Sequence, residues 1–319
     1  MTVAVTDRAL LHELEPVAER CLADHLRKSR AWHPHDYVPW GQGRNFAALG
    51  GSVWEPEQSA LPEVARVALV TTLLAEDDLP SYHRVITDTF GAGGVWGTWV
   101  GCWTAEENRH ALVIRDYLVV TRAVDPVALE RARMTQPTSG VSDPEAPRLL
   151  RGLACVTLQE LATRISHRNT GIACGEPIAD RMLSRIATDE NLHMIFYRNI
   201  SRAALELAPD AMMRAITEAV TGFRMPGPAR PGFRRHALLL AAHGIYDPPQ
   251  HLESVLRPVL RNWHVFDRTD LTGPGERARD ELAAYLAALE KTADRFRERR
   301  ERARAREAAF ADGPAVVRR

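Results

Sequence analysis

The sequence has no excess charge of either sign, few cysteines and no long apolar run. Its 319 residues include 41 basic and 41 acidic side chains, so no bulk attraction to nucleic acid or to an anionic membrane is expected. The four cysteines form no C-x-x-C pair, which argues against a zinc knuckle or a redox pair. The most apolar stretch, residues 67–75, is far shorter than the roughly 20 residues that span a membrane. Because the N-terminus also lacks a secretory signal, we expect a cytoplasmic protein without a membrane span.

Apolar residues recur at intervals of three and four through several long stretches, whereas alternation with a period of two is nearly absent. This pattern predicts an all-α protein. Stretches rich in Gly and Pro, at residues 91–94, 136–147 and 225–232, separate the predicted helices. These helices span residues 8–29, 63–89, 95–122, 146–173, 177–205, 209–223, 232–243, 249–262 and 275–306.

Four central helices exceed twenty residues each, which is long enough for a four-helix bundle, and the later helices are expected to pack around it. Residues 1–298 would then form a single domain. From residue 299 the chain mixes dense charge with alanine, a composition typical of a helix that continues into a frayed tail at 299–319.

Two Glu-x-x-His motifs lie on predicted helices, Glu107 with His110 and Glu190 with His193. Residues three apart share one face of a helix, so each motif directs both side chains the same way. A chain of this composition contains roughly one such pair by chance, and the motif alone is therefore weak evidence.

The arrangement around the motifs is more specific. Each motif helix follows a helix with a glutamate in an apolar stretch, Glu76 after VALVTTLLA and Glu160 after LACVTLQ. Glu107 follows Glu76 by 31 residues, and Glu190 follows Glu160 by 30. The repetition predicts one helix hairpin used twice, in a bundle with approximate twofold symmetry and inward-facing ligands at one level.

Unpaired carboxylates inside a bundle would cost on the order of several kcal/mol each, so a cation is expected among them. Four carboxylates balance two divalent ions. Oxygen ligands with one imidazole per metal suit iron or manganese and leave positions open for O2, while the absence of thiolates argues against structural zinc. The sequence therefore predicts a metal pair held by six residues: Glu76, Glu107, His110, Glu160, Glu190 and His193.

The residue before each motif glutamate is a candidate outer partner of the metal site, since metal-bound imidazoles donate their other N–H to a carboxylate. These residues are Glu106 and Asp189. Bundle symmetry favours a crossed pairing of Asp189 with His110 and of Glu106 with His193. For Glu106, a surface acid is the alternative.

With these residues in place, the chain resembles the soluble acyl-carrier-protein (ACP) desaturases, which are di-iron enzymes of plant plastids and actinobacteria. The resemblance covers roughly residues 10–298, and at Leu192 and Ala111 the actinobacterial branch is the more similar. The matching segments are WHPHDYVPW at 32–40, EDDLPSYH at 76–83, WTAEENRH at 103–110, QELATRISHRNTG at 159–171, DENLHMIFYRN at 189–199 and WHVFDRTDLTGPGERARD at 263–280.

The resemblance implies a ferritin-like four-helix di-iron bundle with additional helices, two Fe ions per chain, and the same six ligands. It also implies a proton-delivery role for Thr163 and an electron path through Trp32 and Asp189. Taken alone, Trp32 would be a packed core aromatic and Thr163 a hydroxyl bonded to its own helix. A homodimer is the family expectation.

The activity that the resemblance implies is an O2-dependent desaturation. Hydrogens are removed from adjacent methylenes of an acyl chain on ACP, and a cis double bond and water are formed. Ferredoxin is the expected electron donor, because the chain has no Rossmann or flavin fingerprint. An acidic carrier protein needs a local basic surface, and Arg27, Lys28 and Arg30 are the candidates, although cations at a helix C-terminus are also favoured by the helix dipole.

Three other functions share parts of this pattern. A ribonucleotide reductase small subunit would place a radical tyrosine near the position of Ile114. Ferritin-like iron storage uses similar ligands in a bundle of about half this length. A di-iron hydroxylase or desaturase that acts on a carrier-bound intermediate of specialised metabolism would use the same six ligands.

Overall fold

The computed structural model describes residues 6–138, 149–224 and 233–311, most of which are helical. These described residues include no β-strand, only an isolated bridge between Phe46 and Ser52. The prediction of an all-α protein is confirmed. No helix within the described ranges is both long enough and apolar enough to cross a membrane.

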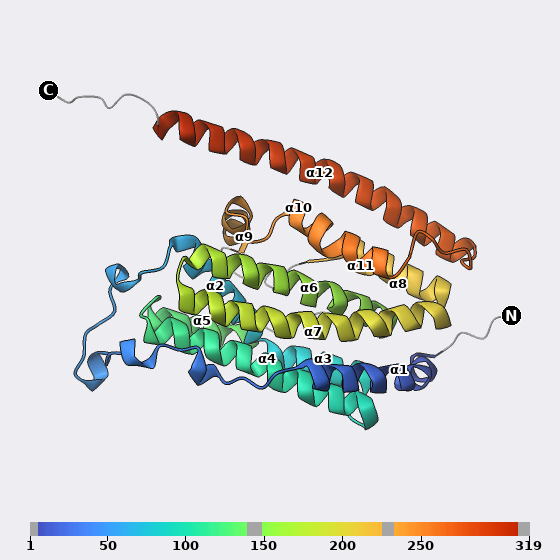
Figure 1. Ribbon diagram of the computed structural model, residues 1–319, viewed down its shortest axis with the longest axis horizontal. Helices are drawn as coiled ribbons and strands as arrows, with labels where there is room; N and C mark the ends of the chain where they lie inside the picture. Colours follow the sequence, from blue (N-terminus) through green and yellow to red (C-terminus); the bar gives the residue numbers. More distant parts are fainter. Residues whose placement is uncertain (1–5, 139–148, 225–232, 312–319) are drawn as a thin grey trace.

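A bundle of four helical arms lies at the centre of the molecule (Figure 1), and α6 and α7 run side by side along its long axis. One arm is made of two consecutive helices. The arms are α2 (Glu63–Glu76) with α3 (Leu79–Phe90), α4 (Gly94–Val120), α6 (Leu149–Cys174) and α7 (Pro177–Leu207).

Helix α1 (Asp7–Lys28) packs against α7 and α4. Thr6 caps its N-terminus by accepting a hydrogen bond from the backbone N–H of Ala9. A stripe on one face of α1 is buried, at spacings of four and then three: Leu10, Leu14, Ala18, Leu22 and His25.

The segment between α1 and α2 consists of short 3₁₀ turns, tied to the C-terminal end of α4 by Arg122. The Arg122 guanidinium donates to the carbonyl of Asn45 at 2.8 Å and to Gln58 Oε1 at 2.9 Å. Trp54 Nε1 donates to the Arg122 carbonyl at 2.9 Å. The turns are Pro34–Asp36, Trp40–Gln42, Ala47–Leu49 and Pro56–Gln58.

The remaining helices cover the bundle. The longest of them, α12, runs along the molecule on the side away from α1 and α4 (Figure 1) and packs against α8. They are α5 (Pro126–Thr138), α8 (Pro209–Thr221), α9 (Phe233–Ala242), α10 (Pro248–Gln250), a π-helical turn (His251–Leu256), α11 (Arg257–Asn262) and α12 (Gly273–Ala311).

The predicted metal ligands separate two apolar clusters along the bundle. On α4, Trp103 belongs to one cluster and Ala111 to the other, with Glu107 and His110 between them. On α7, the buried apolar residues within 179–186 belong to the cluster of Ala111, and those within 194–205 belong to the cluster of Trp103. The polar centre of the molecule is therefore enclosed by apolar packing at both ends.

Some predicted boundaries are wrong. A single helix over 63–89 is replaced by α2 and α3, because Pro80 has no N–H and its ring clashes with the carbonyl four residues before it. The predicted helix 249–262 contains a π-helical turn, and α5 was not predicted. The predicted linkers at 136–147 and 225–232 lie largely outside the described residues. Helix α12 continues past residue 298 to Ala311, and the division into a domain and a tail stays a prediction.

Candidate metal centre

The six predicted ligands meet at the centre of the bundle. Glu107 and His110 lie on one face of α4, and Glu190 and His193 lie on one face of α7. Glu160 comes from the middle of α6, and Glu76 is the last residue of α2. Glu76 is half-buried and the other five are buried, with both histidines fully shielded from solvent.

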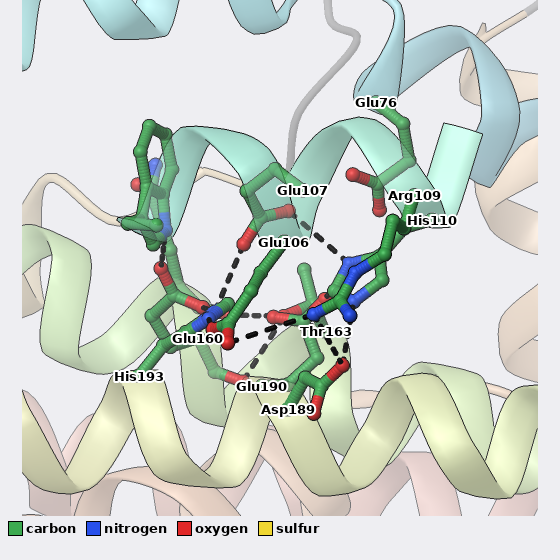
Figure 2. Close-up of polar contacts among 12 residues, drawn as sticks. Glu76, Glu106, Glu107, Arg109, His110, Glu160, Thr163, Asp189, Glu190 and His193 are labelled. Atoms are coloured by element: carbon green, nitrogen blue, oxygen red, sulfur yellow. Dashed lines mark hydrogen bonds and ion pairs between the residues drawn. The ribbon is translucent and has the colours of Figure 1, made fainter. Parts of the chain in front are cut away.

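The Nδ1 atoms of the two histidines face the carboxylates (Figure 2). His110 Nδ1 lies 3.3 Å from Glu107 Oε2 and 3.4 Å from Glu190 Oε1. His193 Nδ1 lies 2.9 Å from Glu107 Oε1 and 3.4 Å from Glu160 Oε2. Each imidazole therefore directs the same ring nitrogen toward the interior of the cluster.

The ligand atoms fall into two overlapping groups, and within each group they all lie within 4.8 Å of one another. The first group is Glu76, Glu107, His110 and Glu190. The second group is Glu107, Glu160, Glu190 and His193. Glu107 and Glu190 belong to both groups, so the arrangement has the form of two adjacent sites that share two carboxylates, each completed by one further glutamate and one histidine.

The chemistry of this donor set fits divalent cations. His110 Nδ1, His193 Nδ1 and Glu107 Oε1 are buried and have no hydrogen-bond partner among the described residues. A buried polar atom without a partner is costly, and a metal ion would satisfy all three. Carboxylate oxygens with one imidazole per site favour iron or manganese over structural zinc.

The pKa values of the cluster show that burial disfavours the ionisation of some of its carboxylates. Burial raises the pKa of Glu76 to about 7 and raises the pKa of Glu160 well above its ordinary value. Burial also acts on Glu190, but the neighbouring His110 and His167 imidazoles, each 3.4 Å from Glu190 Oε1, lower its pKa well below the ordinary value. Without added positive charge, the four carboxylates are therefore not equally ionised.

The outer nitrogen of each histidine faces a carboxylate on the opposite helix. His110 Nε2 lies 3.5 Å from Asp189 Oδ2, and His193 Nε2 lies 2.8 Å from Glu106 Oε2. These are the two pairings expected from the sequence, and their role at a metal stays a prediction. Arg109 lies between the two pairs, with Nη2 3.5 Å from Glu106 Oε1 and 3.9 Å from Asp189 Oδ2.

Thr163 is located one turn after Glu160 on α6. Its hydroxyl lies 2.9 Å from Glu190 Oε2 and 3.0 Å from the backbone carbonyl of Glu160. A hydroxyl has one proton to donate, so it can bond either to its own helix or to the cluster. Trp32 is buried, and its Nε1 donates to Asp189 Oδ2 at 2.7 Å.

Arg27, Lys28 and Arg30 are exposed at and just beyond the C-terminal end of α1. Arg27 is paired with Asp24 at 2.5 Å. The structure thus places these residues on a surface next to the segment that carries Trp32, and it brings none of them to the metal centre.

Further residues that the sequence analysis missed contact the predicted ligands or their outer carboxylates, and three of them carry rings. His167 Nε2 lies 3.4 Å from Glu190 Oε1, and Trp103 Nε1 donates to Glu160 Oε1 at 3.1 Å. His25 Nε2 lies 3.1 Å from Glu106 Oε2. Helical spacing could have indicated His167 and Trp103, because they stand seven residues after Glu160 and four before Glu107. No spacing within α1 relates His25 to Glu106 on α4.

A bundle of four long helical arms around buried carboxylates and imidazoles defines an all-helical, ferritin-like protein whose centre could hold metal. Comparison with known proteins agrees with this class. The sequence profile of the family described as fatty acid desaturase matches residues 6–312.

Individual relatives are named as acyl-ACP desaturases. DesA1 of Mycobacterium tuberculosis is 50% identical over 97% of this chain and 93% of its own length. Acyl-ACP desaturase 4, chloroplastic, of rice is 31% identical over 90% of this chain and 76% of its own length. The X-ray structure of the acyl-ACP desaturase DesA2 of M. tuberculosis is 34% identical and has a TM-score of 0.69 over 80% of this chain and 95% of that chain. The chain therefore belongs to the fatty acid desaturase family, and it is an oxidoreductase.

Proposed function

We propose that the protein binds two iron ions and uses O2, with electrons from ferredoxin, to introduce a cis double bond into an acyl chain carried on ACP. The observation that carries this proposal is the pair of overlapping ligand groups that share Glu107 and Glu190. A single ion would leave part of this buried carboxylate cluster without a counter-charge. The names of the relatives support ACP as the carrier.

Bound iron would supply the oxidant for an unactivated C–H bond, which no acid or base of the protein can attack. The protein's own groups hold and enclose the site. Trp103 orients Glu160, and the two apolar clusters keep bulk water away from the carboxylates. The Thr163 hydroxyl can hold a proton at Oγ1 next to Glu190 Oε2 and release it toward the cluster.

Electrons would enter along Trp32, Asp189 and His110. Trp32 Nε1 and His110 Nε2 lie 2.7 and 3.5 Å from the same Asp189 oxygen, so a continuous series of polar contacts leads from the buried Trp32 indole to the cluster. Asp189→Asn should slow reduction by ferredoxin without removing a ligand. Stopped-flow reduction at the wild-type rate would exclude this path.

The basic residues Arg27, Lys28 and Arg30 are the proposed docking surface for acidic ACP, since complementary charge accelerates encounter. A homodimer and a cytoplasmic location also stay predictions. Whether the product is an alkene or an alcohol distinguishes the desaturase from the related hydroxylase of a carrier-bound intermediate.

The test has two stages. Metal analysis of the purified protein should give about two irons per chain, as the charge balance of four carboxylates requires. The protein is then reduced anaerobically with ferredoxin, mixed with O2 and a panel of acyl-ACPs, and the products are read by mass spectrometry. One zinc per chain, or iron-loaded protein that assembles into a cage and leaves every acyl chain unchanged, would contradict the proposal.

A further inference from the structure

Each half of the centre has one outer carboxylate with an oxygen that lies close to two aromatic ring nitrogens, one of them from a predicted metal ligand. In one half, Asp189 Oδ2 lies 3.5 Å from His110 Nε2 and accepts a hydrogen bond from Trp32 Nε1 at 2.7 Å. The rings of Trp32 and His110 are nearly parallel, at 13°, with centroids 6.3 Å apart.

The other half repeats this arrangement with a different residue. Glu106 Oε2 lies 2.8 Å from His193 Nε2 and 3.1 Å from His25 Nε2. The rings of His25 and His193 are stacked at 25°, with centroids 5.8 Å apart. His25 thus lies beside Glu106 as Trp32 lies beside Asp189. Trp32 donates a hydrogen bond there, whereas neither buried ring nitrogen of His25 has a hydrogen-bond partner among the described residues.

The burial of His25 needs an explanation. Its side chain is 2% exposed, and it continues an otherwise apolar stripe of α1, where a leucine would pack without desolvating a polar ring. The ring edge meets Trp99 at 90°. His25 also lines a small cavity, whose walls are mainly apolar but include Asp24, Lys28 and Asn199. Apolar and aromatic groups therefore surround much of the ring, and Glu106 is its nearest charged neighbour.

We propose that His25 is a positioning residue that fixes Glu106 and, through it, the orientation and tautomer of His193. The proposal rests on the proposed metal-binding function. His193 must carry its proton on Nε2 to present the Nδ1 lone pair to a metal. Glu106 accepts that proton's hydrogen bond, but Arg109 lies near its other oxygen at 3.5 Å and the side chain is 12% exposed. The contact from His25 keeps Glu106 Oε2 at the His193 ring.

The test uses Co(II) as the probe and binding as the readout, so it does not depend on turnover. Wild-type protein should bind two Co(II) ions per chain. In the Co(II) form, each imidazole that binds through Nδ1 gives a strongly shifted, exchangeable Nε2–H proton resonance in the ¹H NMR spectrum. His25→Phe should lower the affinity for one of the two Co(II) ions by about 10- to 100-fold. It should also shift one Nε2–H resonance or speed the exchange of that proton with solvent. His25→Gln, which places a polar amide beside Glu106 again, should recover most of the affinity.

Trp32→Phe is the matched control in the other half. It should shift the other Nε2–H resonance and lower the affinity for the other Co(II) ion. The effects of the two substitutions should add when they are combined. The proposal is overturned if His25→Phe leaves both resonances and both affinities unchanged. It is also overturned if this variant lowers the affinity for both ions equally and lowers the thermal stability of the apoprotein as well. A third contrary result would be that His25→Gln binds Co(II) no more tightly than His25→Phe. Wild-type protein that binds fewer than two Co(II) ions would instead contradict the proposed function.

Discussion

The two hairpins of the bundle share their sequence spacing but differ in their backbone. In the second hairpin, α6 continues unbroken through Glu160 for 14 further residues to Cys174, and His167, seven residues after Glu160, is buried beside the cluster. In the first hairpin, His83 also follows its glutamate, Glu76, by seven residues. There the helix ends at Glu76, and His83 is exposed and contacts Thr104 at 2.8 Å.

This difference shows that equal spacing gives equal placement only where the helix is continuous. Because α2 ends at Glu76 and α3 begins at Leu79, the helical periodicity of α2 is not carried into α3, and a spacing of seven no longer returns a residue to the face of Glu76. Thr163 illustrates the same point. It follows Glu160 by three residues and reaches Glu190, whereas the corresponding position in the first hairpin is Leu79, the first residue of α3.

The largest expected effect is common to both hairpins. Glu107→Ala and Glu190→Ala should each lose most of the bound iron, because each glutamate belongs to both ligand groups. The measurement is iron per chain after anaerobic loading and gel filtration. Asn108→Ala, at an exposed position beside Glu107, is the control and should keep about two irons per chain. Full iron and activity in either glutamate variant would show that the shared-ligand arrangement is wrong.

A comparison of the two histidines tests the difference between the hairpins directly. His167→Ala removes a ring that lies 3.4 Å from Glu190 Oε1 and 3.7 Å from Glu76 Oε1. The affinity of the His167→Ala protein for Fe(II), measured by chelator competition, should be about 10- to 100-fold lower than that of the wild type. His83→Ala should leave the affinity unchanged and alter the free energy of unfolding by less than about 0.5 kcal/mol. Equal effects of the two substitutions would mean that the break in the first arm has no consequence for the site.

Thr163→Val should leave iron content near normal and impair productive use of O2. The valine keeps the shape of the side chain but removes the hydroxyl proton that Thr163 presents to Glu190 Oε2. Product formed per turnover should fall by up to about 100-fold, the lower end of the contribution of a positioned proton donor. Product and O2 consumption are measured together.

Thr157→Val is the matched control for this substitution, on the same helix. The Thr157 hydroxyl is buried and donates to the Leu153 carbonyl at 2.8 Å, away from the cluster. If product formed per O2 consumed falls to the same extent in both valine variants, the effect comes from packing in α6, and Thr163 has no special role.

The smallest expected effect concerns the proposed docking surface for ACP. Arg27, Lys28 and Arg30 lie in the sequence between His25 and Trp32, the two residues that reach the two halves of the centre. Reversal of all three to glutamate should raise the KM for acyl-ACP by about 3- to 10-fold at low salt and flatten its salt dependence, because exposed charges mainly affect encounter. Iron content should be unchanged.

The matched control reverses three exposed arginines on α12, Arg302, Arg304 and Arg306, and produces the same change in net charge. Its KM should remain near the wild-type value. If the two triple variants weaken the use of ACP equally, the effect reflects net charge alone and docking occurs elsewhere.

Most of the helices and all six candidate ligands could be predicted from the sequence. Helix periodicity is local, so the face that carries Glu107 and His110 follows from their spacing of three wherever α4 packs. The break at Pro80 was missed although its signal is also local, because the apolar periodicity continues across it. His25 was missed because a single histidine on an apolar stripe does not reveal its partner.

The sequence by itself determined the class of the protein and the chemistry of its centre. The 3.6-residue repeat of apolar positions specifies long helices, and a doubled glutamate and Glu-x-x-His pattern specifies a carboxylate-rich donor set. Only the tertiary structure decided that Glu107 and Glu190 are shared, that His167 is inside and His83 outside, and that His25 and Trp32 each lie beside an outer carboxylate. The reason is physical: these relations depend on how far each helix is rotated and shifted against its neighbours. Side-chain packing between helices sets that rotation and shift, and no spacing within one helix encodes them.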